Sequence, residues 1–330
     1  MSNHLKNADV SLIGAGPMAV AYARVLAEQQ VDFQVIGRSA SSAESFQQET
    51  GIEVRPGGVE RWLANASHVP EAAIVAVGPQ ELAATTHALM RAGARRILLE
   101  KPGALTFAEL DNLVDARQQH NADVYVAYNR RHYASTLRAE ELIAQDGGVM
   151  SFRFDFTEWS HRLQDSGKPA VELAQWFFLN SSHVVDLAFY LGGRPVSMQS
   201  WASGGLEWHS AASVFCGGGV TQRDALFSYH ANWEAPGRWG VDLMTPHHRI
   251  VLCPLEGVKV QRHGSLEPTE VSLDDELDRR FKPGFYRQIE EFLASPADIR
   301  SPSLDEHHEL WKSVLSPIVT PVSQGNLRVA

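Results

Sequence analysis

DVSLIGAGPMAVAYARVLAEQ, residues 9–29, joins an apolar run to a glycine-rich turn and then to an amphipathic segment. The first part is typical of a buried strand, and Pro17 suits the first position of a helix. Gly14 and Gly16 permit a tight turn, with Ala19 where a third glycine is common. This order predicts a dinucleotide site, in which a pyrophosphate lies on the helix N-terminus; a plain strand–helix turn is the alternative.

The same alternation of strand and helix continues to residue 127. Further strands are expected at VDFQVIG, EAAIVAVG, RRILLE and ADVYVAY, with a weaker one at IEVR. Helices are expected at SSAESFQQE, which has a serine cap, at PQELAATTHALMRAG, which ends at Gly93, and after a capping box of Thr106 and Glu109. Continuous apolar strands between amphipathic helices predict a parallel, doubly wound sheet. We therefore expect a Rossmann domain over residues 1–127.

Residues 128–330 have a different pattern, and the fold class expected for the whole chain is α/β. Helices are expected over 133–145 and 181–191, and most of the segments between them and residue 260 are strands joined by Gly- and Pro-rich turns. This pattern predicts a large, mainly antiparallel open sheet. Two helices, GFYRQIEEFLAS and SLDEHHELWKSVL, close the chain, and the last is expected to pack back on the Rossmann domain.

Composition narrows the classes of partner and compartment. The 330 residues carry a net charge of −10, with 44% hydrophobic and 21% charged residues and a pI near 5.8. This balance argues against nucleic acid or an anionic membrane as a partner. The two cysteines, Cys216 and Cys253, form no CxxC motif, and the polar start lacks the apolar core of a signal peptide. A cytoplasmic protein is expected.

The end of the second strand bears on the choice of cofactor. An NAD site usually has Asp or Glu about 20 residues after the glycines, where it binds the ribose hydroxyls. Here Gly37, Arg38 and Ser39 stand at the tip, with no carboxylate. A guanidinium and a hydroxyl suit the 2′-phosphate of NADP. NADP is therefore favoured over NAD; a solvated loop arginine is the alternative.

Two sets of polar residues carry the chemistry. Glu100 and Lys101 end a strand of the parallel sheet, where ligands bind, and an ammonium there can stabilise a developing alkoxide. His183 and Asp186 lie three residues apart, hence on one helix face, and histidine suits proton transfer near neutral pH. A surface lysine and a structural helical histidine are the alternatives.

The motifs GAGPMA, EKPGALT, YNRRHYAS and HVVDLAFYLGG, in this order and spacing, resemble the Gfo/Idh/MocA oxidoreductase family. The resemblance covers nearly the whole chain. It implies a Rossmann domain followed by an α/β domain whose open sheet commonly forms a dimer interface. It further implies that Lys101 is the catalytic lysine, that the Lys101–Pro102 bond is cis, and that His183 is the acid/base. Asn129 is expected near the nicotinamide and the substrate.

The remaining site residues follow from these motifs. We assign to the cofactor Gly14, Gly16, Pro17, Met18, Arg38, Ser39, Gly78, Gln80, Glu100, Lys101 and Asn129. We assign to the substrate Asn129, Asn180, Asp186 and Arg162. Adjacent histidines in DEHHELW point about 100° apart on a helix, so we expect a solvated helix face there and no metal site.

One departure concerns the acid four residues before the histidine, where many members carry Asp and this chain has Leu179. The function expected is still NAD(P)-dependent hydride transfer with a secondary alcohol or ketone of a sugar, cyclitol or sugar derivative. The alternatives are a nicotinamide-binding regulator without turnover, or glycoside cleavage with a retained nicotinamide. A homodimer or homotetramer through the C-terminal sheet is expected.

Overall fold

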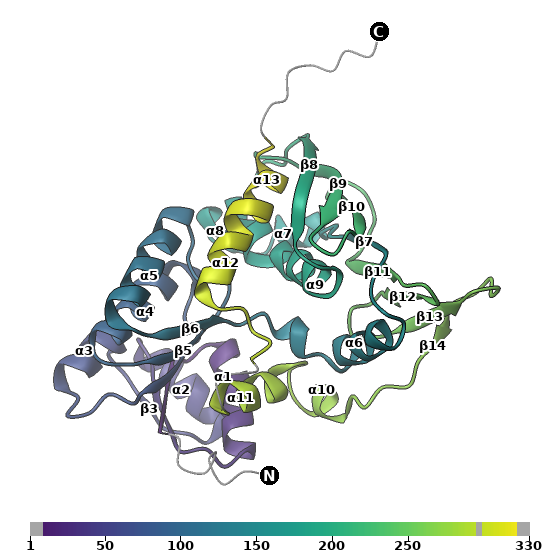
Figure 1. The fold of residues 1–330 in the computed structure, drawn as a ribbon. Coiled ribbons are helices and arrows are strands. Elements are labelled where there is room, and N and C mark those ends of the chain that lie inside the picture. The colour runs from purple at the N-terminus through teal and green to yellow at the C-terminus, as the bar shows by residue number, and fades with distance from the viewer. Residues whose placement is uncertain (1–8, 295–298, 322–330) are drawn as a thin grey trace. The chain divides into compact units, whose positions relative to one another are not determined.

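The computed structural model describes residues 9–294 and 299–321, which separate into two compact units (Figure 1). The first unit combines the described residues up to Ala134 with residues 274–308. The second combines residues 135–273 with the described residues from Glu309 onward. Within the described ranges, no helix has both the length and the apolar character that crossing a bilayer requires.

A six-stranded parallel sheet forms the centre of the first unit, in the order β3-β2-β1-β4-β5-β6. Its strands are β1 (Val10–Ile13), β2 (Phe33–Ile36), β3 (Val54–Arg55), β4 (Ala72–Val75), β5 (Arg96–Leu99) and β6 (Asp123–Val126). The strand order reverses between β1 and β4, and ligands bind beside such a switch point. The predicted Rossmann fold is confirmed.

Helices connect the strands of this sheet, as the alternating pattern predicted. They are α1 (Pro17–Glu28), α2 (Ala40–Thr50), α3 (Gly58–Asn65), the short η2 (Pro79–Glu81), α4 (Leu82–Arg91) and α5 (Phe107–His120). The capping box of α5 is present: the Glu109 amide donates to Thr106 Oγ1 at 3.3 Å, and Glu109 Oε2 accepts from the Thr106 amide at 3.0 Å.

The first unit extends beyond the predicted boundary at residue 127. It also holds η3 (Asn129–His132), α10 (Glu276–Arg280) and α11 (Phe285–Leu293). Phe285 packs in the same core as α1, with its ring centroid 4.5 Å from that of Tyr22. The sequence shows that α11 has an apolar face, but periodicity cannot say which sheet that face covers. The expected boundary at residue 127 therefore places α11 in the C-terminal domain.

The second unit contains an eight-stranded sheet in the order β14-β13-β12-β11-β7-β10-β9-β8. Its strands are β7 (Ser151–Asp155), β8 (Pro195–Ser203), β9 (Val214–Thr221), β10 (Leu226–Asn232), β11 (Gly240–Met244), β12 (His248–Leu252), β13 (Lys259–Arg262) and β14 (Thr269–Glu270). All neighbours pair antiparallel except β7 and β10, which are parallel. The predicted mainly antiparallel sheet is therefore confirmed.

The remaining helices are α6 (Ala134–Gln145), α7 (Ser160–Leu163), α8 (Ala170–Ala174), the π-helix η4 (Phe177–Ser181), α9 (Ser182–Gly192), α12 (Leu304–Leu310), the π-helix η6 (Trp311–Leu315) and α13 (Ser316–Val319). α9 packs on one face of the eight-stranded sheet. Its Phe189 ring lies 5.8 Å from Phe152 and 5.0 Å from Phe227, measured between ring centroids. One face of this sheet is therefore a packed aromatic core, and outward-facing residues line the other.

Candidate functional site

The glycine turn at the end of β1 shows two separate reasons for glycine. Gly14 has φ +128°, and a Cβ there would lie 2.2 Å from the carbonyl oxygen of Ala76, so the turn can only pass β4 without a side chain. At Gly16, which precedes α1, an added Cβ would meet nothing within 4 Å. Pro17 is exposed and Met18 half-buried at the start of the helix. The turn thus leaves open space over the N-terminus of α1, as a pyrophosphate requires.

The tip of β2 presents the residues expected to choose between the two dinucleotides. Ser39 caps α2, its hydroxyl accepting from the Ser42 amide at 3.2 Å. The Arg38 side chain is 79% exposed, and its Nη1 lies 3.2 Å from Glu81 Oε1 of η2. Gly78 and Gln80, at the end of β4, are exposed as well. These residues form the solvent-facing part of the predicted cofactor set.

At the end of β5, the chain turns through Glu100–Lys101–Pro102–Gly103. The Lys101–Pro102 bond is cis, as the family resemblance implied. The Gly103 amide donates to the Glu100 carbonyl at 3.0 Å and closes the turn. Lys101 is half-buried at the carboxyl end of the strand. The turn therefore holds a lysine at the edge of the sheet where a ligand is expected.

Glu100 is directed into the first unit. Its carboxylate is 7% exposed and accepts from the Tyr22 hydroxyl of α1 at 2.7 Å. Burial raises the pKa of Glu100, while the Lys101 charge acts in the opposite direction. Glu100 thus links the lysine turn to the helix that follows the glycine turn, a contact that the sequence did not suggest.

The solvated helix face expected for DEHHELW is present at Asp305, Glu306 and Glu309, which are exposed, but the prediction is wrong for His307. His307 is completely buried, and its Nε2 donates to the Pro102 carbonyl at 2.8 Å. Burial lowers its pKa to about 4, so the ring is neutral near pH 7. His308 points elsewhere, its Nε2 lying 2.5 Å from Asp111 Oδ1. The two adjacent histidines point in different directions, as expected on a helix, but each ring contacts another part of the protein. Local spacing cannot reveal such contacts.

Asn129 lies buried just after β6, with its side chain engaged inside the first unit. Its Nδ2 donates to the Pro283 carbonyl at 3.0 Å, and its Oδ1 accepts from Arg130 Nη1 at 3.2 Å. These contacts attach the segment before α11 to the end of the sheet. The assignment of Asn129 to cofactor and substrate stays a prediction.

The second unit positions the predicted proton-transfer residue. His183 is 4% exposed and Asp186 is 1% exposed on α9, directly after the π-helix η4. The His183 ring lies 6.5 Å from the Trp239 ring, between centroids. π-helical turns occur often at functional sites. Leu179, where the family resemblance implied an acid, is buried within η4.

Glu158 is a candidate site residue that the sequence reasoning missed. It is 7% exposed, and its Oε1 accepts from the Ser181 hydroxyl at 2.6 Å. Asn180 Nδ2 donates to its two oxygens at 3.1 Å and 3.0 Å. The sequence feature that could have indicated Glu158 is its position in FTEW, directly after the predicted strand SFRFD. Asn180 was predicted to bind substrate, and it contacts this carboxylate.

Arg162, the remaining predicted substrate residue, lies on the exposed helix α7. Its guanidinium lies 4.6 Å from the Trp159 ring centroid, and Trp159 Nε1 donates to the Gly237 carbonyl at 3.0 Å. Arg162 therefore stacks on the outside of the loop that carries Glu158. Its assignment to the substrate stays a prediction.

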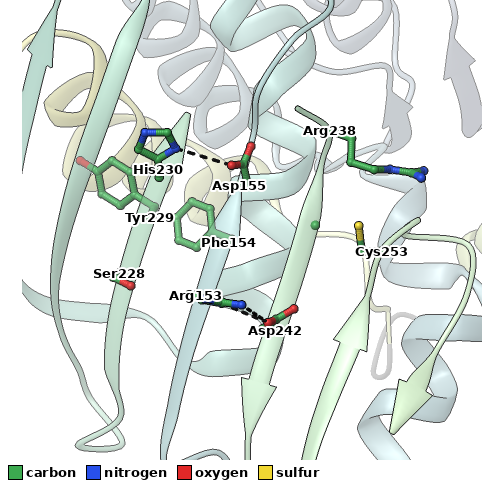
Figure 2. A pocket seen from close by; sticks show the side chains of 10 residues that line it. Arg153, Phe154, Asp155, Ser228, Tyr229, His230, Arg238, Asp242 and Cys253 are labelled. Atoms are coloured by element: carbon green, nitrogen blue, oxygen red, sulfur yellow. Dashed lines mark hydrogen bonds and ion pairs between the residues drawn. The ribbon is translucent and has the colours of Figure 1, made fainter. Parts of the chain in front are cut away.

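A hollow of about 410 Å³ lies on the outward face of the eight-stranded sheet (Figure 2). Arg153 Nη2 contacts Asp242 Oδ2 at 2.9 Å, and His230 Nδ1 lies 3.6 Å from Asp155 Oδ2. Figure 2 shows Cys253 beside these pairs. These two pairs join side chains of neighbouring strands.

Metal-ligand clusters of three or more His, Cys, Asp or Glu side chains do not occur among residues 9–294 and 299–321. The second histidine pair of the sequence, His247–His248, is likewise engaged by protein: His248 Nδ1 lies 2.7 Å from Asp146 Oδ2.

A parallel sheet with a glycine turn at its switch point defines a nucleotide-binding Rossmann domain. Residues 8–128 match the Gfo/Idh/MocA family model, which describes an oxidoreductase family with an NAD-binding Rossmann fold. The predicted resemblance to this family is confirmed over residues 8–128. No curated protein sequence matches the chain.

Solved structures share the fold over nearly the whole chain. UDP-N-acetylglucosamine 3-dehydrogenase GnnA from Acidithiobacillus ferrooxidans has a TM-score of 0.73 at 16% identity, covering 96% of this chain and 98% of that one. An Agrobacterium radiobacter oxidoreductase in complex with NAD+, L-tartaric acid and magnesium has a TM-score of 0.73 at 14% identity, with coverages of 91% and 92%. Levoglucosan dehydrogenase with NADH and L-sorbose has 0.71 at 20%, with coverages of 92% and 94%. At these identities the likeness shows the fold alone.

Proposed function

We propose that this protein is an NAD(P)-dependent dehydrogenase or reductase acting on a secondary alcohol or ketone of a sugar, cyclitol or sugar derivative. The observation that carries the proposal is Lys101, held by a cis-proline turn at the carboxyl end of β5 in a sheet with a nucleotide-type glycine turn. The solved structures similar to this chain include dehydrogenases named for a nucleotide sugar and for levoglucosan, which agree with this substrate class.

The open space at Gly16 and the exposed tip of β2 fit a dinucleotide, whose nicotinamide supplies or accepts the hydride when bound. The protein groups then manage the proton and the charge. His183 takes or gives the hydroxyl proton, and Lys101 stabilises the oxygen as negative charge develops on it. Glu100 and His307 hold the lysine turn from inside, through Tyr22 and the Pro102 carbonyl.

We propose NADP as the preferred cofactor. Arg38 presents an exposed guanidinium at the tip of β2, and Ser39 begins α2 beside it. A guanidinium, a hydroxyl and a helix N-terminus all favour a phosphate, and residues 37–39 include no acid to repel one. Glu81 shares Arg38 through an exposed ion pair, which water and salt weaken.

The test is a substrate panel of sugars, cyclitols and nucleotide sugars, with absorbance followed at the band of the reduced nicotinamide. A change that depends on substrate and releases free reduced cofactor supports the proposal. Cleavage of a glycoside without such release would instead identify the glycosidase alternative. Tight cofactor binding with no turnover across the panel would favour the alternative of a nicotinamide-binding regulator. The absence of an acid at Leu179 is the feature that agrees with this alternative.

We also propose that two copies associate through the outward face of the eight-stranded sheet. Trp201 of β8 is 57% exposed and Leu226 of β10 is 64% exposed on this face. Exposed aromatic and apolar side chains on a sheet are typical of an interface. Light scattering should give at least a dimer, and Trp201→Glu should reduce the mass to that of a monomer. Leu266→Glu, at a 94% exposed leucine in a loop, is the matched control; a parent that is monomeric would refute the association.

A further inference from the structure

Three segments of the second unit meet at one edge of its sheet. β7 and β10 are parallel neighbours, so the segments that follow them leave the sheet at the same end of the strands. β11 begins at that end because it runs antiparallel to β7. The two loops that follow β7 and β10 are bonded to each other. Trp233 Nε1 donates to the Phe156 carbonyl at 3.2 Å, and Trp159 Nε1 donates to the Gly237 carbonyl at 3.0 Å.

The third segment is the turn that leads into α9, and Glu158 connects it to the loop after β7. The Glu158 carboxylate accepts from the Ser181 hydroxyl at 2.6 Å and from the Asn180 amide at 3.0 Å. α9 begins at the next residue, Ser182, and carries His183 in its first turn. The buried carboxylate therefore lies within about a helical turn of the proposed proton-transfer group.

Trp239, from the loop after β10, completes the group. Its ring centroid lies 6.5 Å from that of His183, so an acid, a histidine and a tryptophan from three distant parts of the sequence gather at one edge. The indole offers an apolar surface and the carboxylate an acceptor. A polyhydroxylated ring needs both, because its C–H faces pack on an apolar surface and its hydroxyl groups donate to an acceptor.

A purely structural role explains the burial of this acid poorly. Holding a loop to a turn needs only a hydrogen-bond acceptor, and a neutral glutamine would provide one without the cost of desolvating a charge. Buried charge is concentrated at sites where chemistry or recognition uses it. Glu158 is 7% exposed, and the hydrogen bonds from Ser181 and Asn180 offset part of that cost.

We propose that Glu158 is the acidic residue of the substrate site, replacing the acid that is absent at Leu179. Its carboxylate accepts hydrogen bonds from hydroxyl groups of the substrate, and its charge selects neutral polyols over sugar acids. This inference rests on the proposed function, and it names the substrate class more narrowly. The acid comes from the loop after β7 instead of from the turn before His183, and Asn180 and Ser181 hold it in place.

The test uses Glu158→Gln, which preserves the shape and removes the charge. Isothermal titration of the NADPH-saturated protein with D-glucose, myo-inositol, UDP-N-acetylglucosamine and D-glucuronate would measure binding. Turnover would be measured on the same compounds with NADP+, which accepts the hydride. For the neutral polyol that binds best, the variant should lose about ten- to hundredfold in affinity or kcat/KM. The preference for glucose over glucuronate should fall by at least about tenfold, because the repulsion of the acid is removed.

Asp146→Asn is the matched control. Asp146 is also a buried carboxylate of the second unit, accepting from the Thr245 hydroxyl at 2.6 Å and contacting His248 at 2.7 Å. It should change thermal stability without changing affinity or the glucose-to-glucuronate ratio. Similar losses of activity in both variants, in proportion to their losses of stability, would mean that Glu158 is structural and would overturn the inference.

The binding measurement separates this inference from the proposed function. If the parent binds a polyol but turns none over, the dehydrogenase assignment fails, and weaker binding with altered charge preference in Glu158→Gln still supports the inference. If the parent turns over a polyol and Glu158→Gln keeps its affinity, rate and charge preference within about twofold, the inference is wrong and the function stands. A parent that binds none of the compounds overturns both.

Discussion

The two units place their candidate site residues by different means. In the first unit, Lys101 and the glycine turn lie in short contiguous motifs at the ends of parallel strands. In the second, Glu158 and Asn180 are separated by 22 positions, and Trp239 lies further along the chain. A parallel sheet brings the carboxyl ends of its strands to one edge by construction, whereas an open antiparallel sheet does so only through its particular strand order. Sequence motifs are therefore informative about the first unit and much less so about the second.

The largest effect is expected from removing one proposed catalytic residue of each unit. Lys101→Ala should lower turnover by about 10²–10³, and His183→Ala by about 10²–10⁴. The proposed function has both act on the same substrate oxygen, so the double variant should lose far less than the product of the two. Steady-state rates on a substrate from the panel would measure this.

NADPH affinity is the control for both variants, and it should change far less than turnover, because the pyrophosphate is proposed to rest on the glycine turn. Near-parent rates in both single variants would show that neither residue is catalytic. Fully multiplicative losses would show that they act on different steps.

The glycine turn provides a comparison within a single motif. Gly14→Ala places a Cβ 2.2 Å from the Ala76 carbonyl oxygen, so it should lower the free energy of unfolding by about 2–4 kcal/mol. Gly16→Ala meets nothing within 4 Å and should fold normally. It should still weaken NADPH binding by at least about tenfold, because its methyl group enters the space for the pyrophosphate.

Chemical denaturation and NADPH titration of both variants would measure these effects. Equal stability losses would contradict the distinction between a packing glycine and a binding glycine. Unchanged NADPH affinity in Gly16→Ala would place the pyrophosphate elsewhere.

His307 predicts a dependence of stability on pH. Its pKa falls to about 4 in the folded protein, below the ordinary value near 6.5, so the unfolded chain binds more protons between these values. The contribution of His307 to the free energy of unfolding should therefore be complete above about pH 6.5. It should be lost, by up to ~3 kcal/mol, as the pH falls towards about 4. His132, whose pKa burial also lowers, acts in the same direction.

Urea unfolding would measure the free energy of unfolding of His307→Gln and of the parent between pH 4.5 and 8. This free energy should depend less steeply on pH in the variant than in the parent. His308→Gln is the neighbouring control, because His308 lies on the side of α12 that contacts Asp111. An unchanged slope in His307→Gln would mean that this ring is not kept neutral by burial.

The smallest effect concerns the tip of β2. The parent should bind NADPH about ten- to hundredfold more tightly than NADH, and Arg38→Ala should remove most of that difference, since a charge-assisted phosphate contact is worth about 1.5–3 kcal/mol. Arg24→Ala, which breaks the comparable exposed ion pair with Glu49, should leave the preference unchanged. Equal affinities of the parent for the two cofactors would refute the NADP assignment.

Local patterning was sufficient for most elements. The capping box at Thr106 and Glu109, the strands of the parallel sheet and the helix carrying His183 all occur as predicted. Errors arose where an element's partner lies far away in the chain. DEHHELW has the composition of an exposed helix face, but its His307 is buried against Pro102. The apolar face of α11 was real, although its location on the Rossmann core could not be deduced.

The sequence by itself determined the fold class, the glycine turn, the lysine at the end of β5 and the histidine on α9. Each depends on backbone propensity or on periodicity within about 20 residues, and those are properties of a local segment. Only the tertiary structure decided that Glu100 points to Tyr22, that His307 supports the proline turn, and that Glu158 lies against the turn before His183. These contacts depend on which surfaces exclude water together, and burial of a polar group becomes visible only when its distant partner is in place.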